Sequence, residues 1–347
     1  MGKVGLTFSG VGPNVTKRIQ IWPKCPYRTY IVDEQLIEIV VKQISEDLKT
    51  ENAFIFEASP GRGKLTKALL EAGAQRIRAF VDEGGHKFID DLKDLESKYP
   101  SNLEICDSDL IEINRTIKKD SLKGTSTLPA LFASVPIHSW SDPLPVKMII
   151  PLTPIIETKF LRPLFIQMAH LTGIFTCGRA QILTFVSCYE YSYMKGNAEQ
   201  RNLNNYRSSS VLYNTFFDVE FLAEVPWDCF EPKIGTNSNK LKKQKVSSAF
   251  MVRLTPRKDL PEKLPTIYWL DYIFFVQQAM TKRTAYILAF LEKWAPGCGP
   301  KLIKFGIPHF SRFGDLNPHQ FLDLFCELIT WEEFSFSNFR MNSEIHE

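Results

Sequence analysis

The chain has 347 residues, which is long enough for a sizeable hydrophobic core and for two domains. Hydrophobic residues make up 44% of it and charged residues 23%, values that are ordinary for a globular protein. The formal net charge of +3 is too small to indicate a polyanionic partner by itself, so such a partner must be argued from local clusters of charge.

The seven cysteines form no CxxC pair and show no zinc-ligand spacing. We therefore expect reduced thiols in an intracellular compartment and no metal cofactor. No run of eighteen apolar residues occurs, so we expect neither a transmembrane helix nor a membrane partner.

Residues 1–32 contain five basic side chains and no acidic one. An acid-free basic leader is typical of an organelle-targeting segment. The alternative is a basic extended arm that belongs to the mature protein, and both interpretations stay open. After this segment, Asp33 can cap a helix that runs to about Leu48.

Residues 53–70 predict a buried strand, a tight turn and a helix, and the rest of the chain is organised around them. Gly61 and Gly63 lie in the turn, where bare backbone lets a ligand approach closely. A P-loop is excluded because Leu65 stands where that motif needs serine or threonine. The dinucleotide fingerprint is excluded because Thr66 replaces its third glycine.

The turn resembles motif I of class I, S-adenosylmethionine-dependent methyltransferases, and most closely the form in the rRNA adenine N6-dimethyltransferase family. The residues that carry this resemblance are Glu57, Pro60, Gly61, Gly63, Leu65 and Thr66. Ser59 departs from the pattern, because the family has its first glycine there. Upstream, residues 28–33 resemble the family's Q-N-F-L-x-D segment, which lies over the cofactor.

The resemblance implies five cofactor-binding positions, namely Ile31, Ser59, Gly61, Glu83 and Asp109. Glu83 would accept hydrogen bonds from the ribose, with Asp82 as the alternative, and Asp109 would contact the adenine amino group, with Asp107 as its neighbour. Another interpretation is that Asp82 and Glu83 only cap the helix that follows. Ser59 places a side chain where the cofactor needs bare backbone, so S-adenosyl-L-methionine is a candidate cofactor whose binding can have been lost.

The segment after the predicted strand 146–150 decides catalysis. Active members of the family carry N-L-P-F/Y there, where the amide holds the exocyclic amine of a flipped adenine and the aromatic ring stacks on the base. This chain has Pro151-Leu152-Thr153-Pro154 instead. Neither the amide nor the ring is present, so we expect the catalytic function to be lost and assign no catalytic residue.

Two later segments indicate which branch of the rRNA adenine N6-dimethyltransferase family the chain resembles most. Residues 225–232 parallel the family's V-P-x-x-A-F-x-P and residues 247–256 parallel V-D-S-A-V-V-R-L-x-P. The Pro226-Trp227 version looks like the mitochondrial transcription factor B branch of the family. In that branch the fold serves the single-subunit mitochondrial RNA polymerase, which implies a mitochondrial matrix location, promoter DNA in its melted form as a partner, and rRNA as a further ligand.

Two basic clusters are candidate nucleic-acid contacts. Lys242, Lys243 and Lys245 lie in a predicted loop, and Lys282 and Arg283 stand where the family has a basic run. Such a stripe can neutralise phosphates without reading sequence. The plainer interpretation of the lysine run is a solvated hairpin tip.

We expect an α/β protein: a Rossmann-like class I methyltransferase sheet over residues 33–259, preceded by the basic arm 1–32 and followed by a small helical domain over 260–347. The expected function is assistance in promoter melting and start-site selection. The alternative is an active rRNA adenine N6-dimethyltransferase, and a third reading is an interaction scaffold that does not bind nucleic acid.

Overall fold

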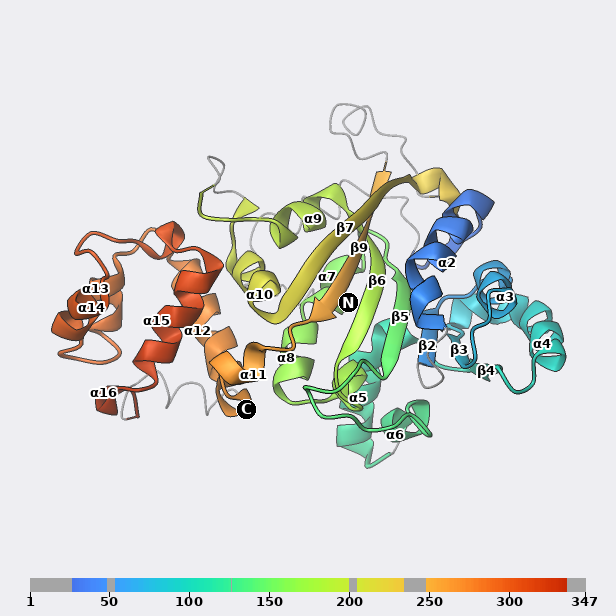
Figure 1. The fold of residues 1–347 in the computed structure, drawn as a ribbon, viewed down its shortest axis with the longest axis horizontal. Helices are drawn as coiled ribbons and strands as arrows, with labels where there is room; N and C mark the ends of the chain where they lie inside the picture. The colour runs from blue at the N-terminus through green and yellow to red at the C-terminus, as the bar shows by residue number, and fades with distance from the viewer. Residues whose placement is uncertain (1–26, 49–53, 126, 200–204, 234–247, 336–347) are drawn as a thin grey trace, which may run out of the picture.

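The computed structural model describes residues 27–48, 54–125, 127–199, 205–233 and 248–335. A seven-stranded sheet forms the centre of this part of the chain, with helices on its faces and a helical region at the C-terminal side (Figure 1). Its strands are β2 (Phe54–Ala58), β3 (Ile77–Phe80), β4 (Leu103–Cys106), β5 (Val146–Pro151), β6 (Ala180–Ser187), β7 (Phe217–Pro226) and β9 (Ser248–Pro256). The predicted α/β class is confirmed.

The spatial order of the strands is β4-β3-β2-β5-β6-β9-β7. The first five are parallel, and β9 runs antiparallel between β6 and β7. The chain builds outward from β2 to β4 and then returns to place β5 on the other side of β2. Ligands of open α/β sheets bind at such a reversal, beyond the carboxyl ends of the strands.

The turn after β2 has the predicted form. All five residues of β2 are buried, and α3 (Lys64–Glu71) begins directly after the turn. Gly61 and Gly63 have φ angles of +58° and +75°, in the left-handed region that favours glycine. Before the turn, α2 (Glu34–Leu48) begins where predicted, because the Leu36 amide donates to Asp33 Oδ1 at 2.9 Å.

Two helical segments of the chain are interrupted or short. Residues 153–170 form α7 (Glu157–Leu161) and α8 (Leu164–Ala169) rather than one helix, because Pro163 lies between them and lacks an amide donor. Residues 284–294 are helical only in α13 (Ile287–Leu291). There the backbone before the helix pairs with a distant segment, since the Ile287 amide donates to the Ser311 carbonyl at 2.9 Å.

The helical region packs on the sheet domain through α10 (Ser208–Phe216), which contacts both α12 (Trp269–Thr281) and α15 (Pro318–Leu328). The rings of Phe216 and Trp269 meet edge to face at 5.7 Å. Asn317 caps α15, because its side-chain oxygen accepts from the Gln320 amide at 2.9 Å. One hydrophobic cluster therefore runs from the sheet into these helices.

The other α-helices are α4 (Ile89–Lys98), α5 (Ile113–Lys123), α6 (Thr127–Leu131), α9 (Cys188–Met194), α11 (Leu260–Lys263), α14 (Gly299–Phe305) and α16 (Glu332–Ser335). A short ladder joins β1 (Tyr30–Ile31) to β8 (Phe230–Glu231). Within the described ranges, no helix has the length and apolarity needed to span a membrane.

Candidate ligand site and nucleic-acid surface

A cavity of about 550 Å³ opens beyond the carboxyl ends of β3 and β4. It is lined by Tyr27, Arg28, Tyr30, Asp82, Glu83, Gly84, Lys87, Asp109, Glu112, Arg115 and Pro232. Of the predicted cofactor positions, Glu83 and Asp109 line this cavity, whereas Ile31, Ser59 and Gly61 belong to the buried segments behind it. In the described part of the chain, no three His, Cys, Asp or Glu side chains gather so as to hold a metal ion.

The glycine turn is packed beneath Tyr30. A Cβ atom added to Gly61 would lie 2.9 Å from the Tyr30 Cβ, so only glycine fits at this point. The Tyr30 ring also meets Phe88 edge to face at 5.5 Å. Burial, and next the charge of Asp82, raise the pKa of Tyr30 to about 12, which keeps its hydroxyl protonated at neutral pH.

Glu57 ties the end of β2 to the first turn of α3. Its side chain is buried, and the Thr66 hydroxyl donates a hydrogen bond to Glu57 Oε2 at 2.7 Å. Burial raises the pKa of Glu57 to about 7, although the Thr66 hydrogen bond acts in the opposite direction. This acidic position of the motif therefore holds the turn against the helix from behind.

The two carboxylates after β3 have different roles. Asp82 Oδ1 accepts from the amides of Gly84 and Gly85, at 2.8 and 3.2 Å, and so caps the short 3₁₀ helix η1 (Glu83–Phe88). Asp82 Oδ2 accepts from the Ser59 hydroxyl at 3.3 Å. The capping interpretation thus applies to Asp82, and Glu83 is exposed on the cavity wall. Its predicted contact with a ribose stays a prediction.

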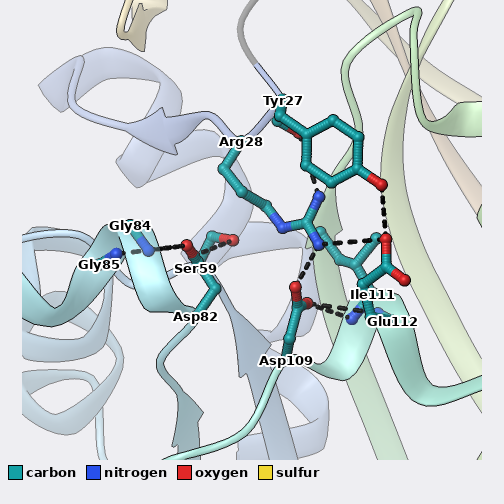
Figure 2. Close-up of polar contacts among 9 residues, drawn as sticks. All are labelled: Tyr27, Arg28, Ser59, Asp82, Gly84, Gly85, Asp109, Ile111 and Glu112. Carbon is teal, nitrogen blue, oxygen red and sulfur yellow. Dashed lines mark hydrogen bonds and ion pairs between the residues drawn. The ribbon is translucent and has the colours of Figure 1, made fainter. Parts of the chain in front are cut away.

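Asp109 is engaged on both of its carboxylate oxygens. Oδ1 accepts from the amides of Ile111 and Glu112, at 2.9 and 3.3 Å, and starts the 3₁₀ helix η2 (Leu110–Glu112). Oδ2 forms an ion pair with the Arg28 guanidinium (Figure 2). Burial raises the pKa of Asp109, and the charge of Arg28 opposes that rise. The neighbouring alternative, Asp107, is exposed and contacts His86 Nε2 at 2.8 Å.

The segment after β5 is turned into the core. All four residues from Pro151 to Pro154 are buried, and Leu152 and Thr153 have no exposed surface. The Thr153 hydroxyl has no hydrogen-bond partner among the described residues. Its backbone carbonyl accepts from the Ile156 and Glu157 amides, both at 3.0 Å, as α7 begins. This segment presents neither an amide side chain nor an aromatic ring.

Of the predicted nucleic-acid contacts, Lys242, Lys243 and Lys245 lie outside the described residues. Arg283 donates to the Tyr206 carbonyl at 3.1 Å, so it joins the helical region to the sheet domain. Lys282 is exposed beside a hollow of about 270 Å³.

Aromatic and basic side chains gather around Lys282. We define the basic–aromatic surface as Lys282, Tyr286, Lys293, Phe310 and Arg312. The Arg312 guanidinium lies 5.5 Å from the centre of the Tyr286 ring, and Phe310, which is 79% exposed, meets the same ring at 5.9 Å. Lys282, Tyr286 and Lys293 line the hollow. The sequence-based argument found only Lys282. Arg312 is far from Tyr286 in the sequence, and a backbone bridge between these two residues brings them together.

The family described as "Ribosomal RNA adenine dimethylase" matches residues 27–330. The "Dimethyladenosine transferase 2, mitochondrial" of Drosophila melanogaster is 26% identical over 370 residues, which cover 92% of this chain and 80% of that protein. The Homo sapiens protein of the same name is 22% identical over 334 residues, covering 88% and 82%. These names confirm the predicted mitochondrial location.

A solved structure supports the fold. The crystal structure of a dimethyladenosine transferase from Plasmodium falciparum superposes with a TM-score of 0.58, covering 89% of this chain and 99% of that one. Its sequence identity is 13%, so the likeness concerns the fold alone. The predicted methyltransferase-type sheet is confirmed.

Proposed function

Because this chain belongs to the ribosomal RNA adenine dimethylase family, we propose that it is a member that has lost methyl transfer and serves as a mitochondrial transcription initiation factor. It assists the single-subunit mitochondrial RNA polymerase in promoter melting and start-site selection. It binds DNA largely through the backbone and through unpaired bases, without a dedicated element for reading sequence.

The burial of residues 151–154 carries this proposal. An enzyme that methylates an adenine amine must pull the base out of its stack, grip its edge with hydrogen bonds and stack a ring against its face. In this chain, Leu152 and Thr153 follow β5 and are fully buried in the protein interior. A flipped base finds no polar grip or stacking ring on this segment, so the inherited scaffold is free for binding alone.

The basic–aromatic surface supports the binding half of the proposal. Proteins that hold single strands combine cations, which follow the phosphates, with aromatic rings on which successive bases stack. Tyr286 and Phe310 supply two exposed rings next to each other, and Lys282 and Lys293 supply cations at the edge of the same hollow. Melted promoter DNA presents the unpaired bases that such a surface can stack.

The test is run-off transcription with purified polymerase on two templates that differ only in a pre-melted start region. We expect the protein to stimulate transcripts strongly from the closed template and little from the melted one. Equal stimulation on both templates would refute a role in melting, and no stimulation on either would refute the transcription role.

An active dimethyltransferase is the second candidate, because the glycine turn of Gly61 and Gly63 keeps its left-handed backbone and Glu83 faces the cavity. A methyl-transfer assay on a small-subunit rRNA hairpin separates the two functions. Our proposal expects no turnover, and methylated adenine in the hairpin would favour the enzyme.

A further inference from the structure

The cavity beyond β3 and β4 lies where the family's fold implies S-adenosylmethionine. Two buried or partly buried carboxylates on its wall are already engaged on both of their oxygens by donors of the protein itself (Figure 2). Asp82 accepts from two amides and the Ser59 hydroxyl. Asp109 accepts from two amides on one oxygen and pairs with Arg28 on the other. An adenosyl amine therefore meets no carboxylate oxygen at this wall that the protein does not already engage.

Arg28 is held in place by the fold. The residues that follow it pair with β8, where Tyr30 faces Glu231 and Ile31 faces Phe230. Beyond the ladder, the Val32 amide donates to the Cys229 carbonyl at 3.1 Å. The register of this short ladder fixes the direction in which the Arg28 side chain leaves the backbone.

The guanidinium of Arg28 is deeply set, since the side chain is only 8% exposed. Besides Asp109, it reaches the Tyr27 carbonyl at 3.2 Å and Glu112 Oε1 at 3.9 Å. The Tyr27 ring covers it at 4.5 Å, and the Tyr27 hydroxyl donates to the same Glu112 oxygen at 2.5 Å. Figure 2 shows the guanidinium enclosed between the Tyr27 ring and the two carboxylates.

We infer that Arg28 closes the adenosine end of this cavity by occupying the carboxylate oxygen that an adenine amine would use. Separating a buried guanidinium from its carboxylate weakens the charge compensation of both groups, so the neutral amine of an adenine competes poorly with Arg28 for Asp109. The chain therefore discriminates against S-adenosyl ligands at Arg28, independently of the loss of the catalytic segment. Arg28 stands at the position where the family pattern has glutamine.

The experiment is isothermal titration of S-adenosylhomocysteine into the full chain and into R28Q. We expect the affinity of R28Q to exceed that of the wild type by at least about tenfold, because the competing cation is gone. R115Q is the matched control, since it removes an exposed arginine from the same cavity without touching Asp109. Wild-type binding as tight as that of R28Q, or an equal gain in R115Q, would overturn the inference.

Circular dichroism checks that R28Q is folded. If R28Q is not folded, R28K is titrated in its place, because the lysine ammonium pairs less well with the Asp109 carboxylate than arginine does. A gain in affinity for S-adenosylhomocysteine over the wild type, smaller than the gain expected for R28Q, supports the inference, and no gain refutes it. The outcome is independent of the proposed function. R28Q should bind S-adenosylhomocysteine and still methylate no rRNA hairpin, because residues 151–154 are unchanged. Its activity in run-off transcription is measured in a separate experiment.

Discussion

Glu57→Gln gives the sharpest test of the packing behind the glycine turn. Glu57 is 2% exposed, and burial raises its pKa from 4.5 to about 7. A shift of this size corresponds to roughly 3 kcal/mol of differential stability between the protonated and ionised forms. Glutamine keeps an oxygen that can accept the hydrogen bond from Thr66, and it cannot ionise.

The sign follows from proton linkage. Between pH 4.5 and about 7 the native state holds a proton on Glu57 that the unfolded state has released, so the free energy of unfolding falls as the pH rises through this window. Urea unfolding of wild type and E57Q at closely spaced pH values measures the effect. Wild-type stability relative to E57Q should fall by roughly 3 kcal/mol between pH 4 and pH 8 and level off outside the window.

Thr66→Val provides the control on the same group. The Thr66 hydroxyl lowers the pKa of Glu57, so its removal should extend the fall in stability to higher pH. A stability difference between wild type and E57Q that stays constant from pH 4 to pH 8 would refute the reasoning, because Glu57 would then titrate alike in the folded and unfolded states.

Three further predictions concern binding and packing. Y286A and F310A should each weaken binding of single-stranded DNA by about 1–3 kcal/mol in fluorescence anisotropy, because each removes a ring on which our proposal stacks a base. Y206F should lower the free energy of unfolding by about 1–3 kcal/mol, because the Tyr206 hydroxyl donates to the buried Leu316 carbonyl at 2.5 Å. F56A should cost about 3–5 kcal/mol in urea unfolding, because Phe56 is fully buried between neighbouring rings.

Each of these has a control within the chain. Phe305 is 38% exposed on α14, so F305A should leave DNA binding unchanged, and an equal loss there would contradict stacking at the basic–aromatic surface. For Y206F, a drop of less than about 0.5 kcal/mol in the free energy of unfolding would contradict the prediction, because the Leu316 carbonyl would then not depend on the Tyr206 hydroxyl. For Phe56, the leucine variant should lose much less than the alanine variant, since less volume is removed.

The turn was predictable because its signal is local, whereas the sheet was expected from the resemblance to the methyltransferase family. Glycines at 61 and 63, placed between a buried apolar run and an amphipathic helix, specify strand, turn and helix within eighteen residues. The start of α15 also has a local signal, because Asn317 and Gln320 form a reciprocal capping box with only three residues of spacing. The break at Pro163 was also readable in principle, because proline rarely sits inside a helix.

The pairings that define the site were not predictable from the sequence. Arg28 and Asp109 are 81 residues apart, and only the register of β1 against β8 aims one at the other. The choice between Asp82 and Glu83 depends on which carboxylate turns toward the amides of η1. Arg283 gave an ordinary basic signal, yet its partner is the backbone of residue 206. The partner of each of these side chains is determined by contacts between distant parts of the chain and not by residue type.

The shared interior of the sheet and the helical region limits how the protein can move. Trp269 and Tyr272 have no exposed surface, and the Tyr272 hydroxyl lies 2.9 Å from that of Thr215 on α10. A chain cut near the predicted boundary at residue 260 would strip both aromatic side chains of their partners. The C-terminal helices therefore share their interior with the sheet domain, and the basic–aromatic surface that we propose for nucleic acid lies on helices that are packed against the sheet and not on a separate module.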